Sequence, residues 1–118
     1  MRVELDVYSG RPNPRWELTD QQAAELLKRL EAAQPIPGDS ASFDGLGYRG
    51  FVVKAEGGGM GGFEEIRVFQ GKVVGIRKGG PAVFRDPRRS LEAWLLESGR
   101  SHIEQATMEY VGKEIEAR

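Results

Sequence analysis

Residues 9–16 read Ser-Gly-Arg-Pro-Asn-Pro-Arg-Trp, and this segment restricts the backbone more than any other part of the chain. Each proline fixes its own φ at about −65° and disfavours helical geometry for the residue before it. Arg11 and Asn13 are these preceding residues, so the segment must run as a stiff, extended loop. Such a loop suits a preorganised binding surface. It also suits a rigid crossover from a strand to a helix.

The residues around this loop predict a strand before it and a helix after it. Apolar and polar residues alternate over residues 2–8, as in a strand with one buried face. After the loop, Thr19 and Gln22 have the spacing of a capping box. Apolar residues at helical spacing follow, and Pro35 predicts that the helix ends near residue 34.

The rest of the chain predicts more strands, followed by helices. Three β-like runs cover residues 48–56, 63–70 and 73–78, and Gly71-Lys72 has the composition of a type II′ hairpin turn. We expect a loop over 79–89, a helix capped by Ser90, and a last helix that starts with a capping box of Ser101 and Glu104 and buries Ile103, Ala106, Tyr110 and Ile115.

This order predicts a single α+β domain over residues 1–118, arranged β-α-β-β-β-α-α. Its sheet should be small, mixed or antiparallel, with the helices packed on one face. The expected core residues share apolar side chains on the inward face of a predicted element: Leu5, Val7, Leu26, Leu27, Leu30, Phe51, Val53, Ile66, Val68, Ile76, Trp94 and Leu95.

Composition excludes several classes of function. The chain has no cysteine and one histidine, so disulfides, thiolate chemistry and a structural zinc site are not expected, and neither is a cofactor. The formal net charge of −1 argues against nucleic acid as an obligatory partner. No apolar stretch reaches membrane-spanning length, and we expect a cytoplasmic protein with no membrane contact.

Three segments with suggestive residues have ordinary alternatives. Gly57–Gly62 contains five glycines and predicts either a mobile hairpin loop or a flap over a ligand. Arg85–Arg89 holds three arginines before Ser90, and it could bind an anion or form a solvated loop in which Asp86 pairs with an arginine. His102 has no partner at catalytic spacing, so we expect it at the surface and predict no catalytic residue.

The proline loop remains the best candidate for a site. We expect Trp16 to be buried and to anchor the loop, while Arg11 or Arg15 meets a carboxylate or a shared pocket. The predicted binding residues are polar or aromatic side chains of the loop and of the start of the next strand: Arg11, Asn13, Arg15, Trp16, Tyr48 and Arg49. The alternative is that these arginines only brace the domain against its own acids.

These observations favour a small non-catalytic binding protein, such as an adaptor, an inhibitor or an immunity-type protein. Its partner would be another protein, and a homodimer is one possibility. The alternative is an enzyme or sensor that binds a small anionic ligand in an arginine-rich pocket made by Arg11, Arg15 and Arg49.

Overall fold

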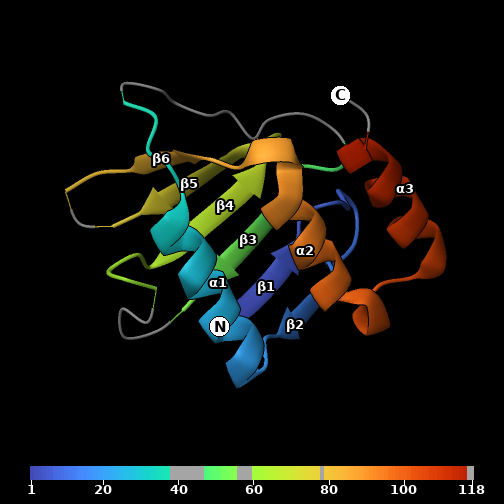
Figure 1. Cartoon of the computed structure of the whole chain (residues 1–118). Coiled ribbons are helices and arrows are strands. Elements are labelled where there is room, and N and C mark those ends of the chain that lie inside the picture. The colour runs from blue at the N-terminus through green and yellow to red at the C-terminus, as the bar shows by residue number, and fades with distance from the viewer. Residues whose placement is uncertain (38–46, 56–59, 78, 117–118) are drawn as a thin grey trace.

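A computed structural model describes residues 1–37, 47–55, 60–77 and 79–116. Its centre is one sheet of six strands in the order β2-β1-β3-β4-β5-β6 (Figure 1). The strands are β1 (Arg2–Leu5), β2 (Arg15–Glu17), β3 (Phe51–Lys54), β4 (Glu65–Phe69), β5 (Lys72–Ile76) and β6 (Ala82–Arg85). All neighbours pair antiparallel, which confirms the α+β class and, of the two sheet types predicted, selects the antiparallel one.

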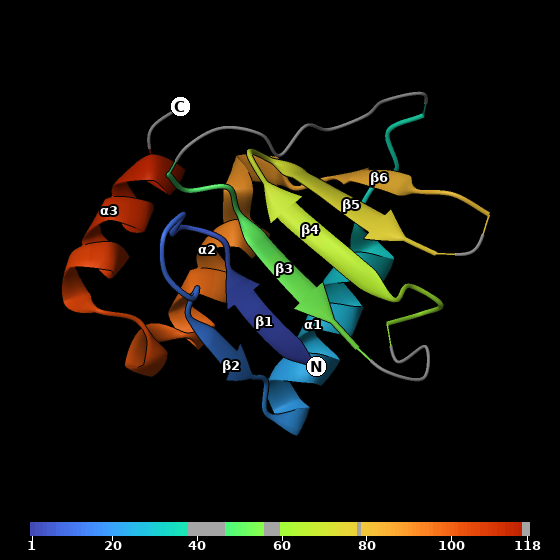
Figure 2. The ribbon, with the colours of Figure 1, turned by 180° about the vertical axis from the view of Figure 1, so that it is seen from behind.

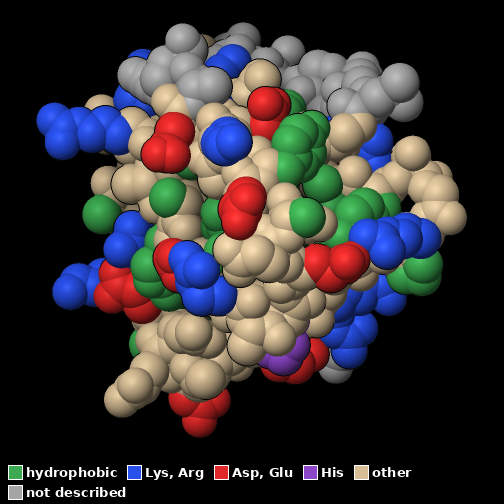
Figure 3. Space-filling model, turned by 90° about the vertical axis from the view of Figure 1, so that its right-hand side faces the viewer, with side chains coloured by type: hydrophobic (Ala, Val, Ile, Leu, Met, Phe, Trp, Pro, Cys, Tyr) green, Lys and Arg blue, Asp and Glu red, His purple; other side chains and the backbone are tan. Residues whose placement is uncertain are grey.

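The helices gather on one face of this sheet, as predicted. They are α1 (Asp20–Ala32), α2 (Ser90–Ser98) and α3 (Gln105–Glu116), with 3-10 turns η1 (Pro87–Arg89) and η2 (Arg100–His102). α1 and α2 cross the sheet, and α3 lies beside α2 (Figure 1). From behind, no described helix covers the opposite face, which we call the open face (Figure 2). Basic and acidic side chains mix at the surface on the side that carries α3 (Figure 3). None of the described helices is long and apolar enough to cross a membrane.

The core lies between the sheet and the helices. Val3, Val53 and Ile66 are neighbours across three strands, and each is fully buried. Most predicted core residues are buried, although Leu27, Leu30 and Trp94 are only partly so.

Ile76 is the exception among the predicted core residues, because 39% of it is exposed. The register places Gly75, not Ile76, opposite Ile66 on the helix-facing side. The ring of Phe63 fills the space at Gly75, where an added Cβ would lie 2.5 Å from Phe63 Cε1. The alternation of side-chain directions along β5 therefore places Gly75 on the helix-facing side, and Ile76 lies on the open face.

Two strands were not predicted from the sequence. β2 forms from the end of the proline loop, where the Leu5 N–H donates to the Pro14 carbonyl at 3.0 Å. β6 forms within the segment expected to be a loop, and Val83 pairs there with Val74. Both strands are short, and each forms because it pairs with a neighbouring strand. The observed order is therefore β-β-α-β-β-β-β-α-α.

The turn of the hairpin between β4 and β5 also differs from the predicted type. Gln70 and Gly71 are the two turn residues, since Phe69 pairs with Lys72. Their φ values are 51° and 80°, and positive φ at both positions defines a type I′ turn rather than II′.

The predicted mobility of Gly57–Gly62 concerns a segment of which residues 57–59 lie outside the described residues.

The first helix begins as predicted, and the two later helices do not. Thr19 and Gln22 form both hydrogen bonds of the capping box. Ser90 is not the cap of α2; the Asp86 carboxylate accepts hydrogen bonds from the backbone N–H groups of Leu91 and Glu92, at 2.9 and 3.1 Å.

The last helix starts later than expected. η2 occupies residues 100–102, so α3 begins at Gln105. The buried residues of α3 are Met108, Val111 and Ile115, and Tyr110 is 44% exposed. Of the predicted face, Ile103 and Ile115 are buried and Ala106 and Tyr110 are exposed.

Candidate functional site

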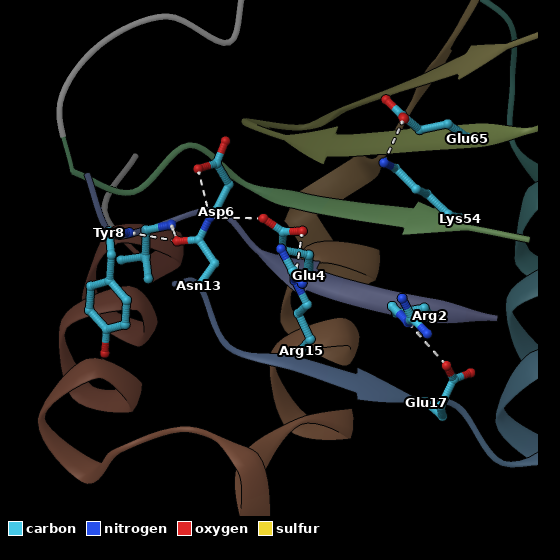
Figure 4. A network of polar contacts seen from close by, with 10 residues as sticks. Arg2, Glu4, Asp6, Tyr8, Asn13, Arg15, Glu17, Lys54 and Glu65 are labelled. Carbon is cyan, nitrogen blue, oxygen red and sulfur yellow. Dashed lines mark hydrogen bonds and ion pairs between the residues drawn. The ribbon is translucent and has the colours of Figure 1, made fainter. Parts of the chain in front are cut away.

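The side chain of Asn13 clamps the proline loop to β1 (Figure 4). Its Oδ1 accepts hydrogen bonds from the backbone N–H groups of Val7 and Tyr8, at 3.0 and 2.8 Å. Its Nδ2 donates to Glu4 Oε2 at 2.9 Å and to Asp6 Oδ1 at 3.4 Å. An amide has two acceptor positions and two N–H donors, so Asn13 uses all four. The loop is therefore fixed in its middle by a side chain as well as by its prolines.

Trp16 fixes the end of the loop, as predicted. It is 4% exposed, and its Nε1 donates to Ser98 Oγ at 2.9 Å. The indole meets Phe51 edge-on and stacks on the exposed imidazole of His102. Because these contacts come from β3, α2 and η2, Trp16 joins the loop to the sheet and to the helical layer.

Each predicted arginine binds a carboxylate of the chain itself. The pairs, with N···O distances of 2.6, 3.2 and 2.7 Å, are Arg11–Glu104, Arg15–Glu4 and Arg49–Asp6. This agrees with the prediction that Arg11 or Arg15 meets a carboxylate. Three different acids are used, and the Asn13 amide links two of them, Glu4 and Asp6.

A cleft of about 330 Å³ opens beside the loop. Its lining combines loop residues with residues near the start of α3: Tyr8, Arg11, Pro12, Asn13, Pro14, His102 and Glu104. Arg11 Cζ lies 3.9 Å from the centre of the Tyr8 ring, a cation–π contact that orients the guanidinium. The exposed position of His102 confirms the prediction made for it.

A larger open hollow of about 780 Å³ lies at the other end of β1. It is lined by Met1, Arg2, Glu17, Ala23, Lys54, Ala55 and Glu64. None of the predicted binding residues lines it. The cleft beside the loop therefore remains the candidate site.

Tyr48 lies in the interior, 5% exposed. Its hydroxyl donates to Glu92, which is fully buried on α2. Arg89 also binds Glu92, with Nε 2.9 Å from Oε1 and Nη2 2.8 Å from Oε2, and its Nη1 donates to the Glu114 carbonyl at 3.0 Å. Burial is the main cause that raises the pKa of Tyr48. The group ties the start of β3 to α2 and α3, so Tyr48 supports the fold around the site and does not face the cleft.

Sequence reasoning did not single out Glu92, and it considered Arg89 only as one of the three arginines of the segment Arg85–Arg89. The available signal is one acid inside the apolar run Leu91–Leu96, because a buried acid needs a partner. The neighbouring Asp86 is also buried. It caps α2 through backbone N–H groups. Its carboxylate thus occupies the position where an external anion could bind.

Comparison of the chain with protein-family models, curated proteins and solved structures finds no match. Among the described residues, no three potential metal ligands lie close enough together to hold an ion. The feature that remains is a proline loop fixed in the middle and at its end. Its residues 9–12 stay exposed, and we call them the loop tip.

Proposed function

We propose that the chain is a non-catalytic binding protein of the cytoplasm that contacts a partner protein through the loop tip and the cleft beside it. The observation that carries this proposal is the contrast within one loop. Asn13 and Trp16 are held by hydrogen bonds and packing, whereas the side chain of Arg11 is 55% exposed. A rigid frame with an exposed arginine costs little conformational entropy on binding.

The residue types at this surface favour a protein partner. Arginine, tyrosine and tryptophan dominate the energetics of protein interfaces. Here Arg11 lies over the ring of Tyr8, and the buried Trp16 anchors the end of the loop. An adaptor, an inhibitor or an immunity-type protein would each use such a surface.

The alternative is a site for a small anion in a pocket of three arginines. It is less favoured because Arg11, Arg15 and Arg49 are each bound to a different carboxylate of the chain. A small anion would have to displace several of these acids to gather the three guanidiniums.

A binding experiment with matched variants tests the proposal. Wild-type protein, the double variant R11A/P12A and the control K28A are immobilised, and each is exposed to extract from the native organism. Lys28 is exposed on α1 and does not line the cleft beside the loop. We expect a partner that wild type and K28A retain and that R11A/P12A loses. Cross-linking of the purified partner should then map to residues 9–14.

Two outcomes would contradict the proposal. A partner retained equally by R11A/P12A would place the interface elsewhere. A nucleotide or phosphorylated metabolite that raises the melting temperature of wild type but not of R11A would favour the small-anion alternative. Light scattering on the same samples separates a self-associating chain from one that binds a different protein.

A further inference from the structure

We propose that the cleft recognises an acidic side chain of the partner, and that Glu104 occupies the position of this side chain in the free protein. The inference rests on the proposed function and names the chemistry of the partner. It follows from the contacts of one carboxylate oxygen, from the exposure of the pair that holds it, and from the walls of the cleft.

Two donors from the loop region converge on Glu104 Oε1. Arg11 Nη2 lies 2.6 Å away, and the Tyr8 hydroxyl lies 3.2 Å away. The Tyr8 hydroxyl is also 2.7 Å from Thr107 Oγ1. When Tyr8 donates to Glu104, Thr107 can donate to Tyr8, so the donors form a chain that ends on the carboxylate. The arrangement is a receptor for a carboxylate, and hydrogen bonds to a charged acceptor are the stronger kind.

Glu104 can be exchanged for another carboxylate because its ion pair is exposed. The side chains of Arg11 and Glu104 are 55% and 65% exposed, and such pairs contribute little net free energy. The pair Arg49–Asp6 is different, with 19% and 17% exposure. The exposed pair Arg100–Glu97 lies within a single turn of chain, and within the described part of the chain no hydroxyl donates to Glu97 beside Arg100. Among these three pairs, only Arg11–Glu104 lines the cleft.

The walls of the cleft fit a protein segment better than a lone anion. Pro12 and Pro14 offer apolar, rigid surfaces next to the guanidinium, and neither ring donates a hydrogen bond. An extended segment could lay its apolar atoms against the prolines while its aspartate or glutamate replaces Glu104 on Arg11 and Tyr8. We therefore commit to an acidic segment of a partner protein as the occupant.

A titration with defined peptides tests this inference. The probe is an acetylated tetraglutamate amide, with a tetraglutamine amide as its uncharged control and acetate as a free carboxylate. NMR spectra report the Arg11 Nε–H and the backbone amides of residues 104–107. Wild type, E104Q, R11Q and the control E109Q are compared. Glu109 is an exposed acid of α3, five residues after Glu104, and its side chain accepts a hydrogen bond from Gln105.

Removing the internal competitor should strengthen binding. We expect E104Q to bind tetraglutamate about two- to fivefold more tightly than wild type, the range that an exposed ion pair supplies. E109Q makes the same change in charge and should bind as wild type does. R11Q should lose the binding, and tetraglutamine should bind none of the four proteins.

Equal tightening by E104Q and E109Q would reduce the effect to net charge and overturn the inference. Acetate binding as tightly as the peptide would also overturn it, in favour of a small carboxylate. Absence of tetraglutamate binding to both wild type and E104Q overturns the inference even if a captured partner depends on the loop tip. In that case the proposed function stands, whereas a partner indifferent to R11A/P12A defeats the function itself.

Discussion

The indole of Trp16 lies directly on Gly99, so closely that a Cβ added to Gly99 would be 2.4 Å from Trp16 Cζ2. Gly99 ends α2 with a φ of −105°, a value open to any residue. The glycine is therefore required by the space that the indole fills and not by the backbone. This contact lets the buried end of the proline loop pack against the helical layer.

Replacing this glycine tests the packing of the indole. We expect G99A to destabilise the fold by about 1–3 kcal/mol, because the new methyl group must push the ring aside. Gly112 in α3 is the matched control, since nothing lies within 4 Å of its added Cβ. G112A should stabilise the protein by about 0.5–1 kcal/mol through helix propensity. Urea unfolding measures both, and equal effects would show that the ring yields freely.

The Asn13 clamp can be tested with an isosteric change. N13D keeps the acceptor for the Val7 and Tyr8 N–H groups but turns the donor toward Glu4 and Asp6 into a carboxylate. We expect N13D to lower the free energy of unfolding at pH 7 by about 1–3 kcal/mol, because an acceptor then faces two acceptors. Chemical denaturation measures the change. If N13D is as stable as wild type, the two contacts of Nδ2 do not hold the loop.

The buried hydroxyl of Tyr48 should matter more than the exposed one of Tyr110. Y48F leaves the buried Glu92 without one of its donors, and we expect a loss of about 1–3 kcal/mol. Y110F removes a long contact of 3.4 Å at a half-exposed ring and should change stability by less than about 0.5 kcal/mol. Thermal unfolding of the two variants compares them, and the reverse order would contradict the role assigned to the buried group.

Asp86 should make its own contribution to the pH dependence of stability. Burial, the largest cause, raises the pKa of Asp86 above its ordinary 3.8, although two backbone hydrogen bonds oppose the shift. The folded state then holds a proton that the unfolded chain has already released. Stability from this group is therefore present below pH 3.8 and declines as the pH rises through the folded pKa.

The variant D86N isolates this effect. We expect the difference in unfolding free energy, wild type minus D86N, to fall as the pH rises above 3.8 and then to level off. Urea unfolding at a series of pH values measures it. A difference that stays constant or rises with pH would show that the cap hydrogen bonds, and not burial, set the titration of Asp86.

The type I′ turn offers a stabilising change. Gln70 has a φ of 51°, which asparagine tolerates better than glutamine, and Asn-Gly is the preferred pair in such turns. We expect Q70N to raise the melting temperature by a few degrees, since about 0.5–1 kcal/mol shifts a domain of this size by that amount. A lower melting temperature would mean that the Gln70 side chain stabilises the hairpin in another way.

Local features were readable from the sequence because their causes are local. The capping box of Thr19 and Gln22 depends on two residues three apart, and the stiffness of the proline loop depends on proline geometry alone. The burial of Trp16 could be predicted because a large apolar ring beside a rigid loop is stabilised when it is removed from water. The strand β1 could likewise be predicted, because the two-residue alternation of apolar and polar residues is visible in the sequence.

Tertiary structure decided everything that depends on distant partners. β2 and β6 are too short to show a period, and each is a strand because it exchanges hydrogen bonds with a neighbouring strand. Arg11 meets Glu104 across 93 positions of sequence, and Tyr48 meets Glu92 across 44. The sequence by itself determined that a rigid loop carries arginines; which acid each arginine binds, and whether it can be displaced, depends on how the sheet brings α3 beside that loop.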